Sequence, residues 1–177
     1  PEGEQIYFAL SRDGRTWTAL NEGQPTLVST LGEQGVRDPY LLRSPDGDRF
    51  FLIATDLCIR CRPDWKRAVR QGSRSLVVWE STDLVSWSEP RLVQVAPDDA
   101  GCTWAPEAIY DEAGGDYLVF WASTTGRDDF QKHRIWAART TDFREFSEPF
   151  VLIEKPTTII DTTIVRDGGR YYRFTKD

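Results

Sequence analysis

Apolar and polar residues alternate in three segments of the chain, a pattern typical of short, half-buried strands. The segments are VRDPYLLRS, WAPEAIYDE and IIDTTIVRD, and each is followed by a Gly-containing turn and an aromatic second strand. Each first strand starts near an acidic residue, and these residues, Asp38, Glu107 and Asp161, lie 69 and 54 residues apart. A repeat of this length built from short strands is typical of propeller blades, so we expect an all-β fold of the β-propeller class.

A second repeat marks the ends of the third strands, where Ser or Thr stands two residues before an Asp. The aspartates of this repeat are Asp13, Asp83 and Asp142. Asp favours such turns because its carboxylate accepts hydrogen bonds from backbone N–H groups two residues on. The aromatic residues that follow are Trp17, Trp87 and Phe146. We expect these aromatic side chains to fill the gaps between neighbouring sheets.

The two repeats divide the chain into blades. We expect complete blades over 38–95 and 104–153, the first two strands of a further blade over 161–177, and the outer half of an earlier blade over 5–30. A closed propeller needs ~4–8 blades. We therefore expect residues 1–177 to form part of a longer propeller domain, whose unpaired strand edges would favour self-association.

An insertion, Leu57–Gly72, separates the second and third strands of the first complete blade. Within it, Asp64–Gln71 starts with an acidic residue and predicts one or two turns of helix. Several Arg and Lys residues make the insertion locally basic, which favours a solvated loop on the rim of the fold.

The three cysteines are Cys58, Cys61 and Cys102, and the only histidine is His133. A zinc site needs about four ligands, so we expect no metal or redox centre at the pair Cys58 and Cys61. The expectation is instead that these are surface thiols in a loop, with one disulfide left open as an alternative.

The composition bears on partners and location. The net charge is −6 and the pI about 4.9, so no basic face is available for nucleic acid. No apolar run is long enough to cross a membrane. An acidic chain with seven Trp suits neutral ligands such as sugars. No signal peptide is visible, so secretion cannot be read directly from the sequence, although a secreted or extracellular location is favoured.

In a propeller the first strand of each blade lines the axis, so the repeat would gather the carboxyl groups in one funnel. Clustered carboxyl groups in a cleft are what the hydrolysis of a glycosidic bond requires. This placement is the basis for a glycosidase hypothesis.

The order Arg37-Asp38-Pro39, then Trp104-Ala105-Pro106, then Ile160-Asp161-Thr162 resembles glycoside hydrolase family 43 over nearly the whole chain. The resemblance implies a five-bladed propeller that cleaves arabinose- or xylose-containing plant glycans with inversion. It implies that Asp38 is the general base and that Asp161 tunes and orients the catalytic groups. The family's general acid, a Glu, would lie beyond Asp177, so the 177 residues alone are expected to be inactive. Family members need no cofactor, although some hold a calcium ion on the axis.

Four further residues are candidates for substrate binding. Glu107 would bind a sugar hydroxyl or bond to the backbone, and Trp104 would stack on a sugar ring or pack between blades. Arg37 and Arg74 would bind substrate hydroxyls or keep Asp38 ionised.

Two other functions remain open. Fructan-cleaving propellers also carry an Arg-Asp-Pro segment, and in their register Asp38 would stabilise the transition state while Glu107 acted as the acid of a retaining mechanism. The third hypothesis is a carbohydrate-binding propeller without catalysis. In such a protein the clustered carboxylates would lower stability without serving a reaction.

Overall fold

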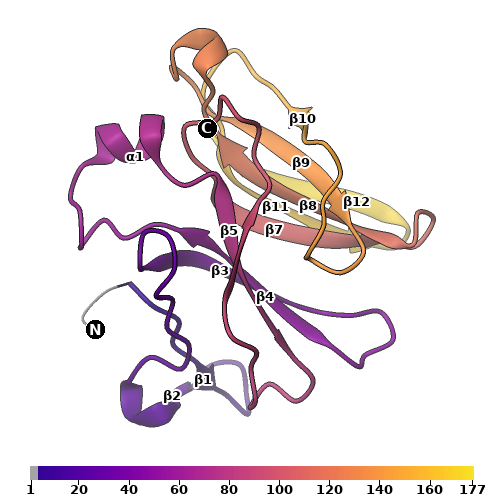
Figure 1. Cartoon of the computed structure of the whole chain (residues 1–177). Coiled ribbons are helices and arrows are strands. Elements are labelled where there is room, and N and C mark those ends of the chain that lie inside the picture. Colours follow the sequence, from indigo (N-terminus) through magenta and orange to yellow (C-terminus); the bar gives the residue numbers. More distant parts are fainter. Residues whose placement is uncertain (1–3) are drawn as a thin grey trace.

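The computed structural model describes residues 4–177, which form four antiparallel sheets (Figure 1). The first sheet is a short hairpin of β1 (Ala9–Leu10) and β2 (Thr18–Ala19). The second has the order β3 (Val36–Arg43), β4 (Phe50–Asp56), β5 (Ser75–Ser81) and β6 (Arg91–Gln94). The third repeats it with β7 (Trp104–Asp111), β8 (Asp116–Ser123), β9 (Arg134–Thr140) and β10 (Phe150–Ile153). The fourth pairs β11 (Ile160–Asp167) with β12 (Arg170–Lys176).

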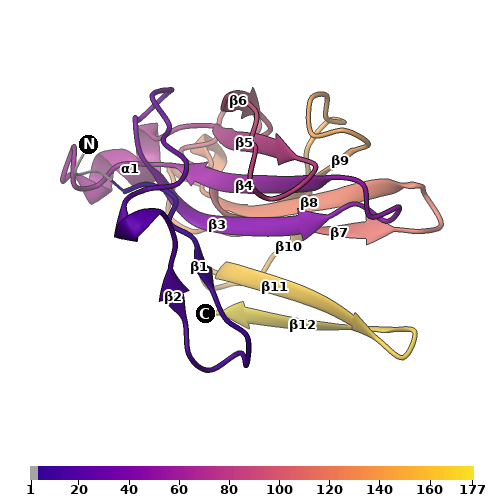
Figure 2. The same cartoon turned by 90° about the horizontal axis from the view of Figure 1, so that it is seen from below.

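The first strands β3, β7 and β11 lie next to one another (Figure 2). The middle strands of the two larger sheets are buried on both faces, which explains their nearly continuous apolar sequences. Three apolar clusters fill the spaces between successive sheets. The largest lies between the second and third sheets and includes Phe51, Trp121 and Phe143.

The Asp turns form as predicted. The carboxylate of Asp83 accepts from the N–H groups of Val85 and Ser86 at 2.8 and 2.7 Å. Asp13 and Asp142 make the equivalent pairs of bonds in their own turns.

The three aromatic residues that follow the Asp turns differ in how they pack. Trp87 packs against Phe8, with 5.7 Å between ring centroids, and Phe146 packs on the largest cluster. The prediction is wrong for Trp17, which is 62% exposed because no described element covers that face of the β1–β2 hairpin. The residue that fills the gap most completely is Phe143, which lies inside its turn and is fully buried.

The insertion contains helix α1 (Trp65–Gln71), which begins where the sequence predicts: the Asp64 carboxylate caps it by accepting from the Arg67 N–H. Two short 3₁₀ turns, η1 (Asn21–Gly23) and η2 (Gly126–Asp128), complete the helical content of the described residues. No described helix combines the length and apolar character needed to span a bilayer.

The expectation of a solvated basic loop is wrong in part. Arg67 donates to both carboxylate oxygens of Glu33, at 2.7 and 2.8 Å, and only 16% of its side chain is exposed. Arg70 pairs with Asp129 and lies over the ring of Phe130. These contacts attach the insertion to the rest of the fold because they satisfy its charges internally.

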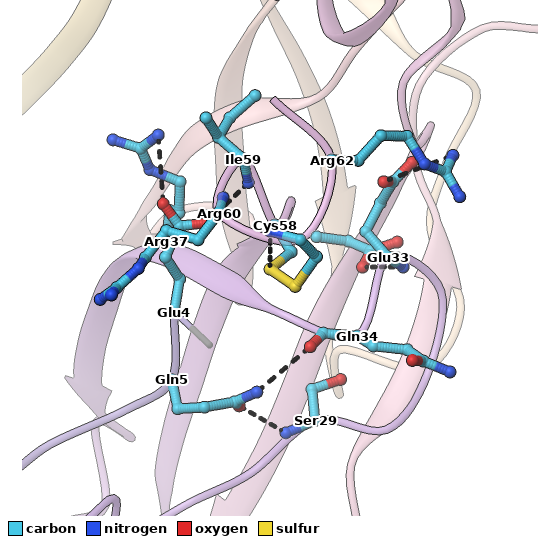
Figure 3. Close-up of a disulfide and its surroundings, with 12 residues drawn as sticks. Glu4, Gln5, Ser29, Glu33, Gln34, Arg37, Cys58, Ile59, Arg60 and Arg62 are labelled. Atoms are coloured by element: carbon cyan, nitrogen blue, oxygen red, sulfur yellow. Dashed lines mark hydrogen bonds and ion pairs between the residues drawn. A yellow bond between two sulfur atoms is a disulfide. The ribbon is translucent and has the colours of Figure 1, made fainter. Parts of the chain in front are cut away.

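Cys58 and Cys61 form a disulfide (Figure 3). Both sulfurs are therefore unavailable as thiolate metal ligands. The expectation of surface thiols is wrong for Cys58, which is fully buried, whereas the alternative of a disulfide is confirmed. Cys102 is also fully buried and remains a free thiol. Burial raises the pKa of the Cys102 thiol to about 11, so this side chain is a structural core residue.

Candidate functional site

Each of the three first strands begins with the same irregularity. The pairing is regular at Arg37, Trp104 and Ile160, is then interrupted, and resumes at Tyr40, Glu107 and Thr163. Inside the interruptions Asp38, Ala105 and Asp161 take left-handed conformations, with φ of 47°, 49° and 51°. Asp is among the few residue types that adopt this conformation readily. The bulge therefore turns the same backbone position toward the shared side of all three strands.

This register corrects the predicted repeat. Glu107 was expected to be equivalent to Asp38 and Asp161, but Ala105 holds that position. Glu107 lies two residues further on, level with Tyr40 and Thr163. The error arises because the repeat was aligned on the nearest acidic residue, and a shift of two residues leaves the alternation of apolar and polar positions along a strand unchanged.

The three acids nevertheless border one pocket of about 340 Å³ between β3, β7 and β11. Its lining consists of Asp38, Pro39, Tyr40, Ala105, Pro106, Glu107, Asp161, Thr162 and Thr163. The pocket thus combines apolar walls with several carboxyl groups, a combination common to small-molecule sites.

Asp38 is the carboxyl group whose environment is most tightly defined. Burial raises its pKa, and the negative charge of Asp161 acts in the same direction. A hydrogen bond at 3.1 Å from the Thr55 hydroxyl to Asp38 Oδ2 opposes this shift, as does the Arg37 charge. The Thr55 hydroxyl also accepts from the backbone N–H of Ala105 at 2.8 Å. Thr55 therefore connects Asp38 on β3 to the bulge of β7.

Asp161 lies in a more open environment. Its side chain is 48% exposed, and Lys176 Nζ lies 3.1 Å from its Oδ2. Lys176 is the pairing partner of Ile160 just as Thr55 is the partner of Arg37. The same register position on the second strand thus supplies each acid with a donor.

Glu107 keeps an unused acceptor. Burial raises its pKa, the neighbouring Thr163 side chain opposes the shift, and Glu107 Oε2 is buried without a hydrogen-bond partner. A buried carboxylate oxygen without a partner is costly, and a hydroxyl group entering the pocket would satisfy it.

The other predicted binding residues do not line the pocket. Arg74 bonds to the Asp98 backbone carbonyl at 2.5 Å. Arg37 is directed toward Glu4, at 3.7 Å, and lies over the ring of Trp65 (Figure 3 shows the pair with Glu4). Arg37 therefore acts on Asp38 through its charge, whereas Arg74 makes no contact with Asp38.

Trp104 packs against side chains from helix α1 and from the segment that precedes β9. The Trp104 ring approaches the ring of His133, with 5.1 Å between centroids. The ring of Trp65 meets Trp104 edge-on, with 6.0 Å between centroids. Burial lowers the pKa of His133 to about 4, so its imidazole is neutral at neutral pH. Its Nε2 is buried without a partner.

Thr55, Trp65 and His133 are the residues around the site that sequence reasoning missed. Thr55 carries the one visible signal, a hydroxyl side chain at the end of an apolar strand. The roles of Trp65 and His133 depend on contacts with Trp104, which is distant from both in sequence. Across residues 4–177, no group of three or more His, Cys, Asp or Glu side chains is arranged to hold a metal ion.

Comparisons with known proteins bear on the family and the fold of the chain. The chain is 34% identical to an α-L-arabinofuranosidase of Bifidobacterium longum subsp. longum over 195 residues, 99% of this chain and 18% of that protein. An endo-arabinase from Bacteroides thetaiotaomicron superposes with a TM-score of 0.69 at 14% identity, covering 98% of this chain and 62% of that one. A GH32 β-fructofuranosidase of Bombyx mori gives 0.64 at 18% identity, covering 94% and 35%.

The chain therefore spans 18% of the curated relative's length and 35% and 62% of the two structures. The structural likeness confirms the predicted all-β propeller class. The family described as "Probable glycosyl hydrolase domain" matches residues 1–177, so the chain belongs to this family, which is related to glycoside hydrolase family 43.

Proposed function

We propose that the protein is a glycoside hydrolase that acts on arabinose- or xylose-containing glycans with inversion of the anomeric carbon. The observation that carries the proposal is that Asp38 and Asp161 occupy the same bulge position on β3 and β11 and border one pocket. The 34% identity to an α-L-arabinofuranosidase supports the sugar class.

In the proposed reaction, the ionised Asp38 takes a proton from a water molecule that attacks the anomeric carbon. A protonated carboxyl group gives its proton to the leaving oxygen, and the two groups stand ~6.5–9.5 Å apart so that the water fits between them. We propose that Asp161 orients the sugar and tunes the neighbouring carboxyl groups by its charge. The general acid would come from outside the 177 residues, so that these residues alone would hydrolyse glycosides poorly.

Glu107 supports a second candidate function. Its raised pKa and its unpartnered oxygen suit a group that donates a proton, as the fructan-cleaving register requires. In that register the products retain their anomeric configuration and Glu107 is essential. The proposal above instead has Glu107 accept a hydrogen bond from a sugar hydroxyl.

Product stereochemistry tests the proposal against this alternative. The natural protein would be incubated with aryl arabinofuranoside and aryl xyloside substrates, and the first-formed anomer read by proton NMR. Inversion, with measurable turnover by Glu107→Gln, is the expected result. Retention together with loss of turnover in Glu107→Gln would favour the fructan-type mechanism, and sugar binding without turnover would favour a non-catalytic module.

Thr55→Val is expected to lower kcat/KM about tenfold and to shift its acidic limb to higher pH. The variant removes a hydrogen bond that stabilises the charged form of Asp38, and such bonds to charged groups contribute about 1.5–3 kcal/mol. Steady-state kinetics across pH would measure both effects. Thr55→Ser, which keeps the hydroxyl, is the matched control. An unchanged pH profile in Thr55→Val would show that the Thr55 hydroxyl does not tune the base.

A further inference from the structure

We infer that Trp65, with Arg37 beneath its ring, forms a second sugar-binding position next to the acidic pocket. It would take one further sugar residue of the glycan chain. This inference rests on the proposed function, which supplies the glycan, and it assigns a role to the insertion that carries α1.

The first observation is that Trp65 is exposed yet held in place. The residue is 52% exposed, a large apolar area for a tryptophan on a short surface helix. The Arg37 guanidinium carbon lies 5.4 Å from the centre of its ring, and the ring of Trp104 meets it edge-on at 6.0 Å. One face of the indole is therefore covered by a cation, and its orientation is fixed from the side.

The second observation is that Arg37 is itself anchored. Its guanidinium pairs with Glu4 at 3.7 Å, and the other carboxylate oxygen of Glu4 accepts from the Ile59 N–H at 2.7 Å (Figure 3). Ile59 stands inside the four-residue loop closed by the disulfide between Cys58 and Cys61. The base of the proposed position is thus tied to a cross-linked loop.

The third observation concerns the rigidity of α1. Arg67 forms its two short bonds to Glu33, and the Gly72 N–H donates to the Gly101 carbonyl at 2.8 Å. The Thr124 hydroxyl donates to the Val69 carbonyl at 2.5 Å. Each end of the helix is therefore attached to a neighbouring segment, so that Trp65 loses little conformational entropy when a ligand binds.

The fourth observation is continuity with the acidic pocket. Arg37 and Trp104 immediately precede Asp38 and Ala105, which line that pocket. Consecutive Cα atoms are about 3.8 Å apart, so both residues that Trp65 contacts are chain neighbours of residues that line the pocket. A glycan with one sugar among the carboxyl groups would carry its next residue toward this edge.

The chemistry of the position fits a sugar. The C–H face of a sugar ring is apolar and packs on an aromatic ring, while its hydroxyls need polar partners at the periphery. The Arg37 guanidinium covers one face of the indole, so the sugar ring would pack on the opposite face. The other strongly exposed tryptophan, Trp17, has no such cation among its described contacts and lies on the β1–β2 hairpin.

The test uses the natural protein and its Trp65→Ala, Trp65→Phe and Trp17→Ala variants. Hydrolysis and calorimetric binding would be measured with an aryl glycoside and with arabino- and xylo-oligosaccharides from disaccharide to pentasaccharide. Trp65→Ala is expected to weaken binding and kcat/KM about tenfold for the oligosaccharides, including the disaccharide, which already reaches the second position. The loss should be smaller for the aryl glycoside, which has no second sugar residue. Trp65→Phe should recover part of the loss, and Trp17→Ala should match the wild type.

Two outcomes would overturn the inference: equal effects of Trp65→Ala on the aryl glycoside and on the oligosaccharides, or no effect on the oligosaccharides. The result is separable from the proposed function. Oligosaccharide binding that depends on Trp65 in a protein without hydrolytic activity would support the sugar position and reject catalysis. Hydrolysis that depends on Asp38 but not on Trp65 would support catalysis and reject the sugar position. A wild-type protein that binds none of these oligosaccharides would reject both.

Discussion

Replacing Asp38 by Asn is expected to lower kcat/KM about 10²- to 10⁴-fold, the range that a positioned general base contributes. The amide keeps the size and the left-handed backbone conformation of Asp38, since Asn also adopts it readily, but it cannot accept the proton of water. Kinetics on an aryl arabinofuranoside would measure the loss. Asp48→Asn, an exposed aspartate on the turn that joins β3 to β4, is the matched control and should be unchanged.

The pH dependence sharpens this prediction. The base must be ionised, so activity should fall as the pH drops through the pKa of Asp38, which burial raises above the usual range for aspartate. Asp161 contributes to this raised pKa by like-charge repulsion. Asp161→Asn should therefore move the acidic limb to lower pH as well as reduce kcat. Near-normal turnover by Asp38→Asn, or no movement of the limb in Asp161→Asn, would contradict the assignments.

Replacing Phe143 by Ala is expected to destabilise the protein by about 3–5 kcal/mol. Phe143 is fully buried between the second and third sheets, where its ring centroid lies 4.5 Å from that of Phe51 and 4.8 Å from that of Tyr117. Truncation would leave a cavity between two sheets that a short turn cannot collapse to fill. Chemical denaturation, with the midpoint and slope fitted together, would give the change in the free energy of unfolding.

Leu84→Ala is the control for this experiment. Leu84 occupies the same position of the Asp turn in the second sheet and shares the left-handed conformation, with φ of 63° against 57° for Phe143. It is 39% exposed, so its truncation should cost at most about 0.5 kcal/mol. Equal losses in the two variants would mean that the turn backbone, and not packing between the sheets, determines the cost.

The strand pairs, the Asp turns and the helix start follow from local chemistry. Alternation of apolar residues marks strands, and the side chains of Asp83 and Asp64 bond to backbone groups within three residues of themselves. Such interactions need no distant partner, so the amino-acid order is sufficient to predict them. The order of Arg-Asp-Pro, Trp-Ala-Pro and Ile-Asp-Thr was likewise sufficient to identify the family.

Tertiary structure alone decided the register of the acids and the surroundings of the site. A shift of two residues leaves the alternation of a strand unchanged, and the pairing of β7 with β8 established that Ala105, and not Glu107, matches Asp38 and Asp161. The Thr55 bridge and the Arg37 contact with Trp65 each join residues 17 or more positions apart. Such contacts depend on how the sheets pack, and packing is a property of the whole chain that no local pattern records.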